Sequence, residues 1–315
     1  MRSLLACLAV VACTAGPAAA QILDGNLPTY RPLNDLQGQV TLMGSTTMTS
    51  VAGVWTDSFS QYYPQARTDI EIRGSRGAVP AVMSGEATFG LLSRKITTAE
   101  VDAFAAKFGY KPKVATVCLE RIGVWTHRDN PVRQLSLAQV ASILSGQTRT
   151  WGEVGATGAY ANQPIRVHGR GPDTGSRVFI ENALLRGGKH NPVVEHGSNA
   201  ALIDGVAEDR LAIGYAGLIY ANNTVRSVAI SRGEGYPAVA VDSLDAARGN
   251  YVLVRPLQLV INQKPGTELP AAAGEFVKYV LSRSGQEDVI KGGFQPISAG
   301  PAEIALDQIG LRAAR

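Results

Sequence analysis

Four short clusters of Ser, Thr, Gly and Arg contain the residues best suited to bind an anion. They are Gly44-Ser45-Thr46-Thr47, Gly74-Ser75-Arg76-Gly77, Ser93-Arg94 and Arg170-Gly171-Pro172-Asp173-Thr174-Gly175-Ser176. Hydroxyls donate hydrogen bonds, Gly lets the backbone approach a ligand, and Arg carries a permanent charge on a planar fork of donors. Each cluster stands ahead of a helical pattern, and a helix start offers unpaired N–H groups and a partial positive charge. Together they predict an oxyanion held by converging helix starts.

Helix capping is the alternative explanation for each cluster taken alone. Ser and Thr commonly cap the first turn of a helix, and Gly is common in turns. Capping explains the last cluster less well, because there Arg170 precedes both a turn and a Thr-Gly-Ser helix start. The order of the whole set favours anion binding.

The sequence contains no arrangement typical of catalysis or metal binding. Ser176 lies in Thr-Gly-Ser-Arg, not in the Gly-x-Ser-x-Gly of a nucleophile elbow. Gly169-Arg170-Gly171 is too short for a dinucleotide-binding fingerprint. The spacing of the histidines is not that of metal ligands; they are His127, His168, His190 and His196. We therefore expect no enzyme activity, no catalytic residue, no metal and no cofactor.

Short apolar runs alternate with helix-period segments, which is typical of an α/β protein. Apolar strands are predicted to lead into the four clusters at residues 40–43, 68–72, 89–92 and 165–168. Further strands are predicted at residues 122–126, 211–216 and 251–261. Pro256 lies inside the last of these and predicts an edge strand or a break, because Pro has no N–H to donate. Residues 21–37 and 231–250 have weak periodicity and are predicted to be loops.

Residues 1–20 have the features of a signal peptide. Arg2 precedes an apolar run at residues 4–13, and Ala18-Ala19-Ala20 is a small-residue cleavage site. We predict cleavage after Ala20 and export to the periplasm. As an alternative, Val-Val-Ala-Cys at residues 10–13 is similar to a lipoprotein signal that would leave Cys13 lipidated. No other segment approaches the ~20 apolar residues that a membrane span needs.

Length and composition allow one large domain or two of ordinary size. The chain has 315 residues, of which 45% are hydrophobic and 18% charged. Its net charge of +4 comes without a dense basic run, so nucleic-acid binding is not expected. Removal of residues 1–20 would leave Cys118 as the one cysteine, and its apolar surroundings predict a buried thiol in a strand.

In its motifs and their order, the chain resembles the periplasmic phosphate-binding proteins of ABC phosphate importers. These have the type II periplasmic-binding-protein fold, and the likeness runs from about residue 38 to residue 298. Besides the four clusters, the matching segments are residues 85–94, residues 135–146 with Trp151, Ile213-Gly214-Tyr215, Ser284-Gly285-Gln286 and residues 292–296.

The resemblance implies two α/β lobes joined by two crossovers, with the ligand in a cleft between the lobes. Lobe one is expected to comprise residues 21–119 plus 226–315, and lobe two residues 120–225. The crossovers are expected near residues 118–120 and near residues 226–228. Lobe closure would be a hinge motion around the ligand.

The resemblance also transfers a set of phosphate-binding residues by position. They are Ser45, Thr46, Thr47, Ser75, Ser93, Arg94, Arg170, Thr174, Gly175 and Ser176. Asp173 would orient Arg170, as a nearby acid does in the family. The expected partners are inorganic phosphate and an inner-membrane ABC permease, and we expect a monomer.

The chain departs from the family at two positions. Some members have Asp where Ser93 stands, and that carboxylate accepts the proton of hydrogen phosphate and rejects sulfate. Ser93 can accept the same proton, because a hydroxyl is both donor and acceptor, but it repels sulfate less. Arg76 replaces the usual small residue and would either contact the ligand or point to solvent. Because Asp is absent at residue 93, sulfate or a molybdate-like oxyanion is an alternative ligand. A separate alternative is a phosphatase relative on the same fold.

Overall fold

The computed structural model describes residues 22–172, 174–191 and 194–311. The predicted signal peptide, the alternative lipidation site at Cys13 and Asp173 lie outside the described residues. Among the described residues, no helix combines the length and the apolar character that a membrane crossing requires.

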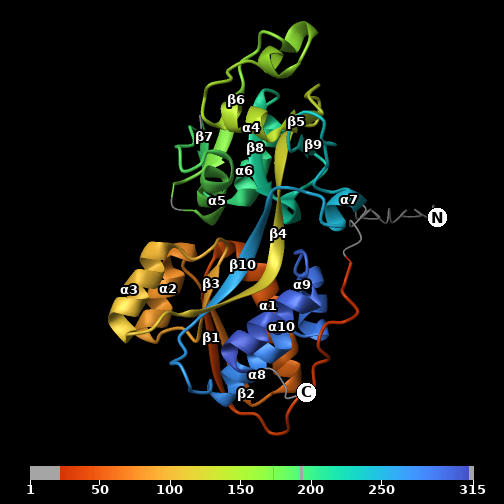
Figure 1. Cartoon of the computed structure of the whole chain (residues 1–315). Helices are drawn as coiled ribbons and strands as arrows, with labels where there is room; N and C mark the ends of the chain where they lie inside the picture. The colour runs from red at the N-terminus through yellow and green to blue at the C-terminus, as the bar shows by residue number, and fades with distance from the viewer. Residues whose placement is uncertain (1–21, 173, 192–193, 312–315) are drawn as a thin grey trace, which may run out of the picture.

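The chain forms two bodies, each with its own hydrophobic core, joined by two long strands (Figure 1). The first body contains β1 (Gly38–Gly44), β2 (Ala66–Ile72), β3 (Phe89–Leu92), η1 (Thr46–Met48), α1 (Thr49–Tyr62), α2 (Ser75–Ser84), α3 (Thr98–Phe108), α8 (Ala271–Val280), α9 (Arg283–Lys291) and α10 (Ala299–Ile309). The second contains β5 (Gln134–Ser136), β6 (Arg166–Arg170), β7 (Val194–His196), β8 (Ala212–Gly217), β9 (Val225–Ser231), α4 (Leu137–Leu144), η2 (Trp151–Val154), η3 (Gly158–Tyr160), α5 (Gly175–Leu184), α6 (Asn199–Glu208), η4 (Leu218–Tyr220) and α7 (Leu244–Ala247). The predicted α/β class is confirmed.

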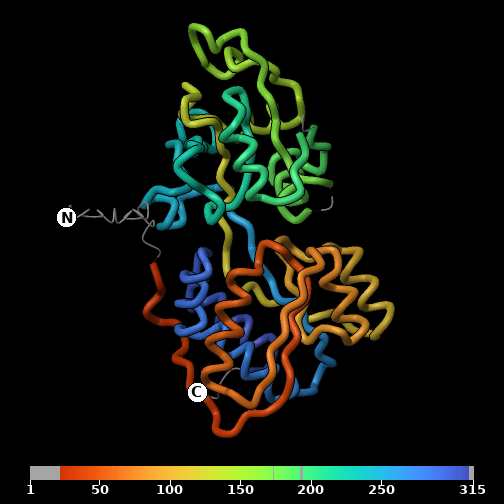
Figure 2. Tube along the Cα trace, turned by 180° about the vertical axis from the view of Figure 1, so that it is seen from behind, coloured from red at the N-terminus to blue at the C-terminus, as the bar shows by residue number. Residues whose placement is uncertain are grey.

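The joining strands are β4 (Lys113–His127) and β10 (Val254–Ile261), which run antiparallel to each other. The strand order is β2-β1-β3-β10-β4-β8-β6-β7, with β5 and β9 attached beside β4. Residues 113–121 of β4 pair with β10, whereas residues 122–127 pair with β8 and β9. Seen from behind, β4 and β10 again pass side by side between the two bodies (Figure 2).

Strand pairing and core packing favour a later return of the chain from the second body than the resemblance implies. Residues 226–228, where the second crossover was expected, lie in β9 and pair with residues 124–126 of β4. Val241 and Leu253 also pack in the second core. We therefore propose that the second crossover lies near residue 255, so that lobe two extends from about residue 121 to about residue 254.

Pro256 lies in an interior strand, not at an edge. Its neighbour across the sheet is Leu119, whose backbone N–H and C=O both bond to Gln295, at 2.8 and 2.9 Å. No hydrogen bond from residue 256 is therefore missing, and Pro is tolerated. β10 continues through Pro256, so the predicted edge or break in this strand is wrong. The register shift between Leu257 and Gln258 comes from the additional residue Val117 on β4.

The apolar patterns place the core residues correctly. Trp55 and Trp151 are fully buried, and their indole N–H groups donate to Gly285 O at 2.9 Å and Leu211 O at 3.2 Å. Cys118 is a buried free thiol in β4, as predicted. Burial raises the pKa of this thiol well above its usual value, so it is a poor nucleophile.

Replacement of Phe276 by Ala is expected to lower the free energy of unfolding by about 3–5 kcal/mol. Phe276 is fully buried on α8, with ring centroids 5.2 Å from Phe59 and 5.7 Å from Phe89. Urea denaturation followed by circular dichroism measures the change. Ile304→Ala is the control, because Ile304 is 59% exposed on α10. Equal stabilities of the two variants would contradict this account of the first core.

Candidate functional site

The clusters from the two bodies meet beside the crossover strands. Ser93 follows β3 of the first body, and Gly175 begins α5 of the second. A Cβ atom added to Gly175 would lie 2.3 Å from Ser93 Oγ. The two halves of the predicted site are therefore in contact, with Gly where any larger residue would collide.

The first cluster owes its shape to a glycine. Gly44 has φ +138°, and a Cβ there would lie 2.4 Å from the carbonyl oxygen of Leu91. This close approach lets Ser45 N donate to the same carbonyl at 3.0 Å. Ser45 Oγ then accepts from Thr47 N at 3.2 Å at the start of η1. Ser45 and Thr47 are buried, whereas Thr46 is exposed.

Ser75 and Ser93 form a buried hydroxyl pair. Their Oγ atoms are 3.1 Å apart, and Ser93 N donates to Ser75 Oγ at 3.2 Å. Ser75 is the first residue of α2, as expected, but Ser93 does not stand at a helix start. The next helix, α3, begins at Thr98 and is capped by Thr97. Ser93 is instead presented by the end of a buried strand.

Arg94, which was predicted to bind the anion, and Arg76, which was offered as a possible contact, lie apart from the clustered hydroxyls. The Arg94 guanidinium binds both carboxylate oxygens of Glu100, at 2.7 and 2.8 Å, and donates to Lys95 O. Glu100 also completes the capping box of α3, so the structure ties Arg94 to that helix and does not place it among the site hydroxyls. Arg76, the second residue of α2, is exposed.

Arg170 lies at the end of β6 and is buried. Its backbone N donates to the Tyr215 hydroxyl at 3.3 Å, and its Nη1 donates to Asn199 Oδ1 at 3.3 Å. Burial lowers the pKa of Arg170 from its usual value. Its Nε is buried without a hydrogen-bond partner, which leaves one donor available to a ligand.

The start of α5 supplies the remaining predicted residues. Thr174 caps the helix, accepting from Arg177 N at 3.5 Å while donating to Gly171 O at 2.9 Å. Ser176 is buried, and its Oγ lies 3.5 Å from Asn199 Oδ1. The hydroxyl of Thr174 therefore serves the cap, and that of Ser176 lies in the same network as Arg170.

We call the region where the two bodies meet beside β4 and β10 the junction. Two of its charged residues, Arg255 and Glu120, are absent from the phosphate-binding residues predicted from the sequence. Arg255 on β10 is fully buried, and its Nε and Nη2 lie 2.7 and 2.6 Å from Oε2 of Glu120 on β4. Nη2 also donates to Thr47 Oγ1 at 3.3 Å and to Ser176 Oγ at 3.2 Å. Arg255 thus bonds to both halves of the site. The available signal was a charge inside each of two long apolar strand patterns.

The junction brings together two buried guanidiniums, those of Arg170 and Arg255. Among the described residues, Glu120 is the carboxyl that pairs with Arg255. Burial raises the pKa of Glu120, and the Arg255 charge opposes that rise. Arg255 in turn contributes to the lowered pKa of Arg170, because like charges disfavour each other. Arg255 Nη1, like Arg170 Nε, is a buried donor without a partner. An anion would satisfy both the charge and the donors.

Two of the histidines pair with each other. His168 Nδ1 and His196 Nε2 are 3.1 Å apart, and burial lowers the pKa of both rings. Within the described ranges, no three His, Cys, Asp or Glu side chains group as a metal site requires.

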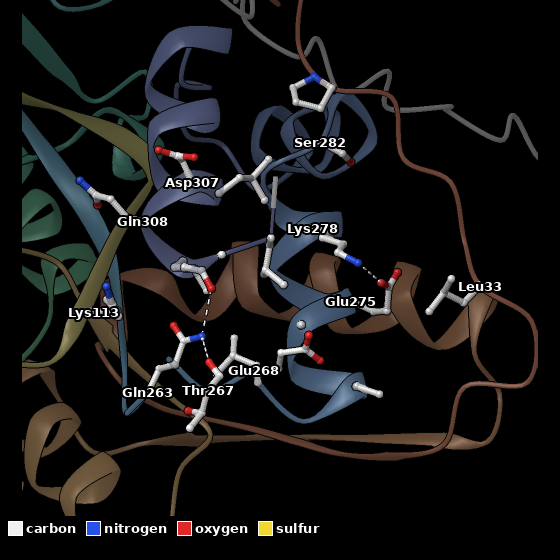
Figure 3. Close-up of a pocket in the computed structure, with 18 of the residues that line it drawn as sticks. Leu33, Lys113, Gln263, Thr267, Glu268, Glu275, Lys278, Ser282, Asp307 and Gln308 are labelled. Atoms are coloured by element: carbon white, nitrogen blue, oxygen red, sulfur yellow. Dashed lines mark hydrogen bonds and ion pairs between the residues drawn. The ribbon is translucent and has the colours of Figure 1, made fainter. Parts of the chain in front are cut away.

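A separate hollow of about 1130 Å³ lies on the first body, away from these residues (Figure 3). The N-terminal segment, α8 and α10 line it, and its labelled lining residues include Gln263, Lys278 and Asp307. Its lining includes none of the clustered hydroxyls or guanidiniums, so the junction is the better candidate for anion binding.

Comparisons with known proteins agree with this architecture. A family model described as a PBP superfamily domain matches residues 31–284. The chain is 33% identical to the phosphate-binding protein PstS of Pseudomonas aeruginosa, covering 99% of each chain. Its fold is similar to that of an ABC-type phosphate transport receptor from Vibrio cholerae, with a TM-score of 0.66 at 20% identity over 82% of this chain and 100% of the other. The structure of PstS from Borrelia burgdorferi is also similar, with a TM-score of 0.58 at 20% identity over 83% of this chain and 99% of the other.

Gly217→Ala is expected to displace the Glu120 carboxylate. A Cβ at residue 217 would lie 1.9 Å from Glu120 Oε1, although the backbone there (φ −59°) suits any residue. Such overpacking costs about 1–3 kcal/mol, which urea denaturation would detect. Gly53→Ala on α1 is the control, because nothing lies within 4 Å of its added Cβ. An unchanged stability of Gly217→Ala would contradict the tight seat of Glu120.

Proposed function

The chain belongs to the PBP superfamily and, within it, to the family of phosphate-binding proteins named PstS, and from this membership we propose that it binds inorganic phosphate for import. The observation that carries the proposal is the buried guanidinium of Arg170, whose Nε has no hydrogen-bond partner. A tetrahedral oxyanion has several acceptor oxygens, so it can take hydrogen bonds from this arginine and from the surrounding hydroxyls at once.

The proposed binding residues come from both halves of the junction. They are Ser45, Thr47, Ser75, Ser93, Arg170, Gly175 and Ser176. Binding is proposed to draw the two bodies together by a hinge motion about β4 and β10. The exposure of Thr46, the capping role of Thr174 and the ion pair of Arg94 make these three poorer ligands.

The proposed role is binding without catalysis. The Ser176 hydroxyl lies beside Asn199 and Arg255, and neither is a general base that could activate it. We further propose that residues 1–20 direct export to the periplasm, where the protein acts as a monomer and delivers phosphate to an inner-membrane ABC permease.

Sulfate is the second candidate ligand. Ser75 and Ser93 present neutral hydroxyls where an acidic residue would reject a fully ionised anion, and Glu120 is already paired with Arg255. Sulfate that displaces labelled phosphate at equal concentration would favour this candidate.

Arg170→Ala is expected to weaken phosphate binding on the order of 100-fold, since loss of one partner of a buried charged contact costs 2–5 kcal/mol. Isothermal titration calorimetry with phosphate measures the loss. Arg166→Ala, which removes a half-exposed arginine from the same strand, should bind as the wild type does. Absence of saturable binding by the wild type would refute the proposed function. Retained affinity in Arg170→Ala would refute the site.

Gly175→Ala is expected to hold the two bodies apart. The added Cβ would lie 2.3 Å from Ser93 Oγ in the closed arrangement, so we expect at least about tenfold weaker phosphate binding. Small-angle scattering should show less compaction on phosphate addition than for the wild type. Gly197→Ala is the control, because its added Cβ meets nothing within 4 Å. Full compaction and wild-type affinity would mean that closure does not bring these residues together.

A further inference from the structure

Arg255 is the most deeply buried arginine of the junction, and the nitrogens of its guanidinium differ in whether they have hydrogen-bond partners. Nε and Nη2 are held by Glu120 Oε2, and Nη2 also donates to Thr47 and Ser176. Nη1 has no partner although the residue is 0% exposed. A guanidinium placed only to bind the two bodies together has no reason to leave a buried donor unpaired.

The unpaired donor faces the place where the two halves of the site meet. A Cβ at Gly175 would lie 3.5 Å from Arg255 Nη1 and 2.3 Å from Ser93 Oγ. Arg255 Nη1 and the Ser93 hydroxyl therefore approach the same point from different strands. The second cation, Arg170, reaches this region from the other body through Asn199 and Ser176.

We propose that Arg255 is a second anion-binding residue, which donates from Nη1 to the same oxyanion that Arg170 binds. The proposal rests on the proposed function. It adds an anion-binding residue that lies on the crossover strand β10, outside the four clusters. Glu120 fixes the guanidinium so that Nη1 points toward the ligand. Because Nη2 bonds to Thr47 of one body and to Ser176 of the other, this placement is complete only when the bodies are closed.

The double variant Arg255→Gln/Glu120→Gln tests the proposal. It removes both charges of the pair together, so no buried charge is left without a partner. Calorimetric titration with inorganic phosphate should show at least about tenfold weaker binding, as expected for a lost charge-assisted hydrogen bond. Arg210→Gln, which removes an exposed arginine paired with Asp129, should bind as the wild type does.

Arg255→Lys is the second variant, in case the double variant does not fold. It keeps the charge and can pair with Glu120, but it lacks the fork that carries Nη1. At least tenfold weaker phosphate binding, with a thermal midpoint close to that of the wild type, is expected. Wild-type affinity in either folded variant overturns the role of Arg255. Failure of the wild-type protein to bind phosphate would overturn the proposed function itself, and the two failures are therefore distinct.

Discussion

The ion pair between Arg255 and Glu120 lies where both crossover strands pass from one core to the other. Burial of two charges is costly, and the attraction between them offsets that cost only with short contacts and further hydrogen bonds. Here the contacts are 2.6 and 2.7 Å, and Thr47 and Ser176 provide the further acceptors. The pair is therefore bonded to one residue from each body.

This dependence explains why small residues surround the junction. Gly217 leaves room for the Glu120 carboxylate, and Gly175 leaves room for the Ser93 hydroxyl. A methyl group at either position would occupy space that a polar group now fills. Close packing at these two glycines restricts where the neighbouring polar groups can lie. It thereby helps to hold together the donors that come from β6, α5, β10 and the residue after β3.

Residues within local motifs can be proposed from the sequence more readily than residues that are brought together by long-range pairing. Ser45, Ser75 and Ser176 belong to turn-and-helix patterns whose local conformation exposes donors, so the sequence offers them as candidates. Arg255 and Glu120 lie in long apolar strands, and only the pairing of β4 with β10 brings them together. No spacing rule connects residues 135 positions apart.

The position of the second crossover was hidden for a related reason. The resemblance implied a crossover near residues 226–228, but these residues lie in β9, which pairs with residues 124–127 of β4. The return strand that we propose, β10, contains Pro256, which by itself argues against an interior position. It is tolerated because Leu119 directs its backbone bonds to Gln295, a partner supplied by the loop after α9. Local propensity was overruled here by tertiary hydrogen bonding.

The chemistry of the site follows from this combination of local and long-range features. Local motifs supply neutral hydroxyls, which both donate and accept, and these place few restrictions on the protonation state of an oxyanion. Among the described residues, Arg170 and Arg255 bring two positive charges to the junction, and Glu120 pairs with Arg255. Buried guanidiniums among hydroxyls suit the oxyanion that we propose as the ligand. On that proposal, the Ser75–Ser93 pair distinguishes hydrogen phosphate from sulfate by accepting a proton, because a hydroxyl accepts hydrogen bonds as well as donating them.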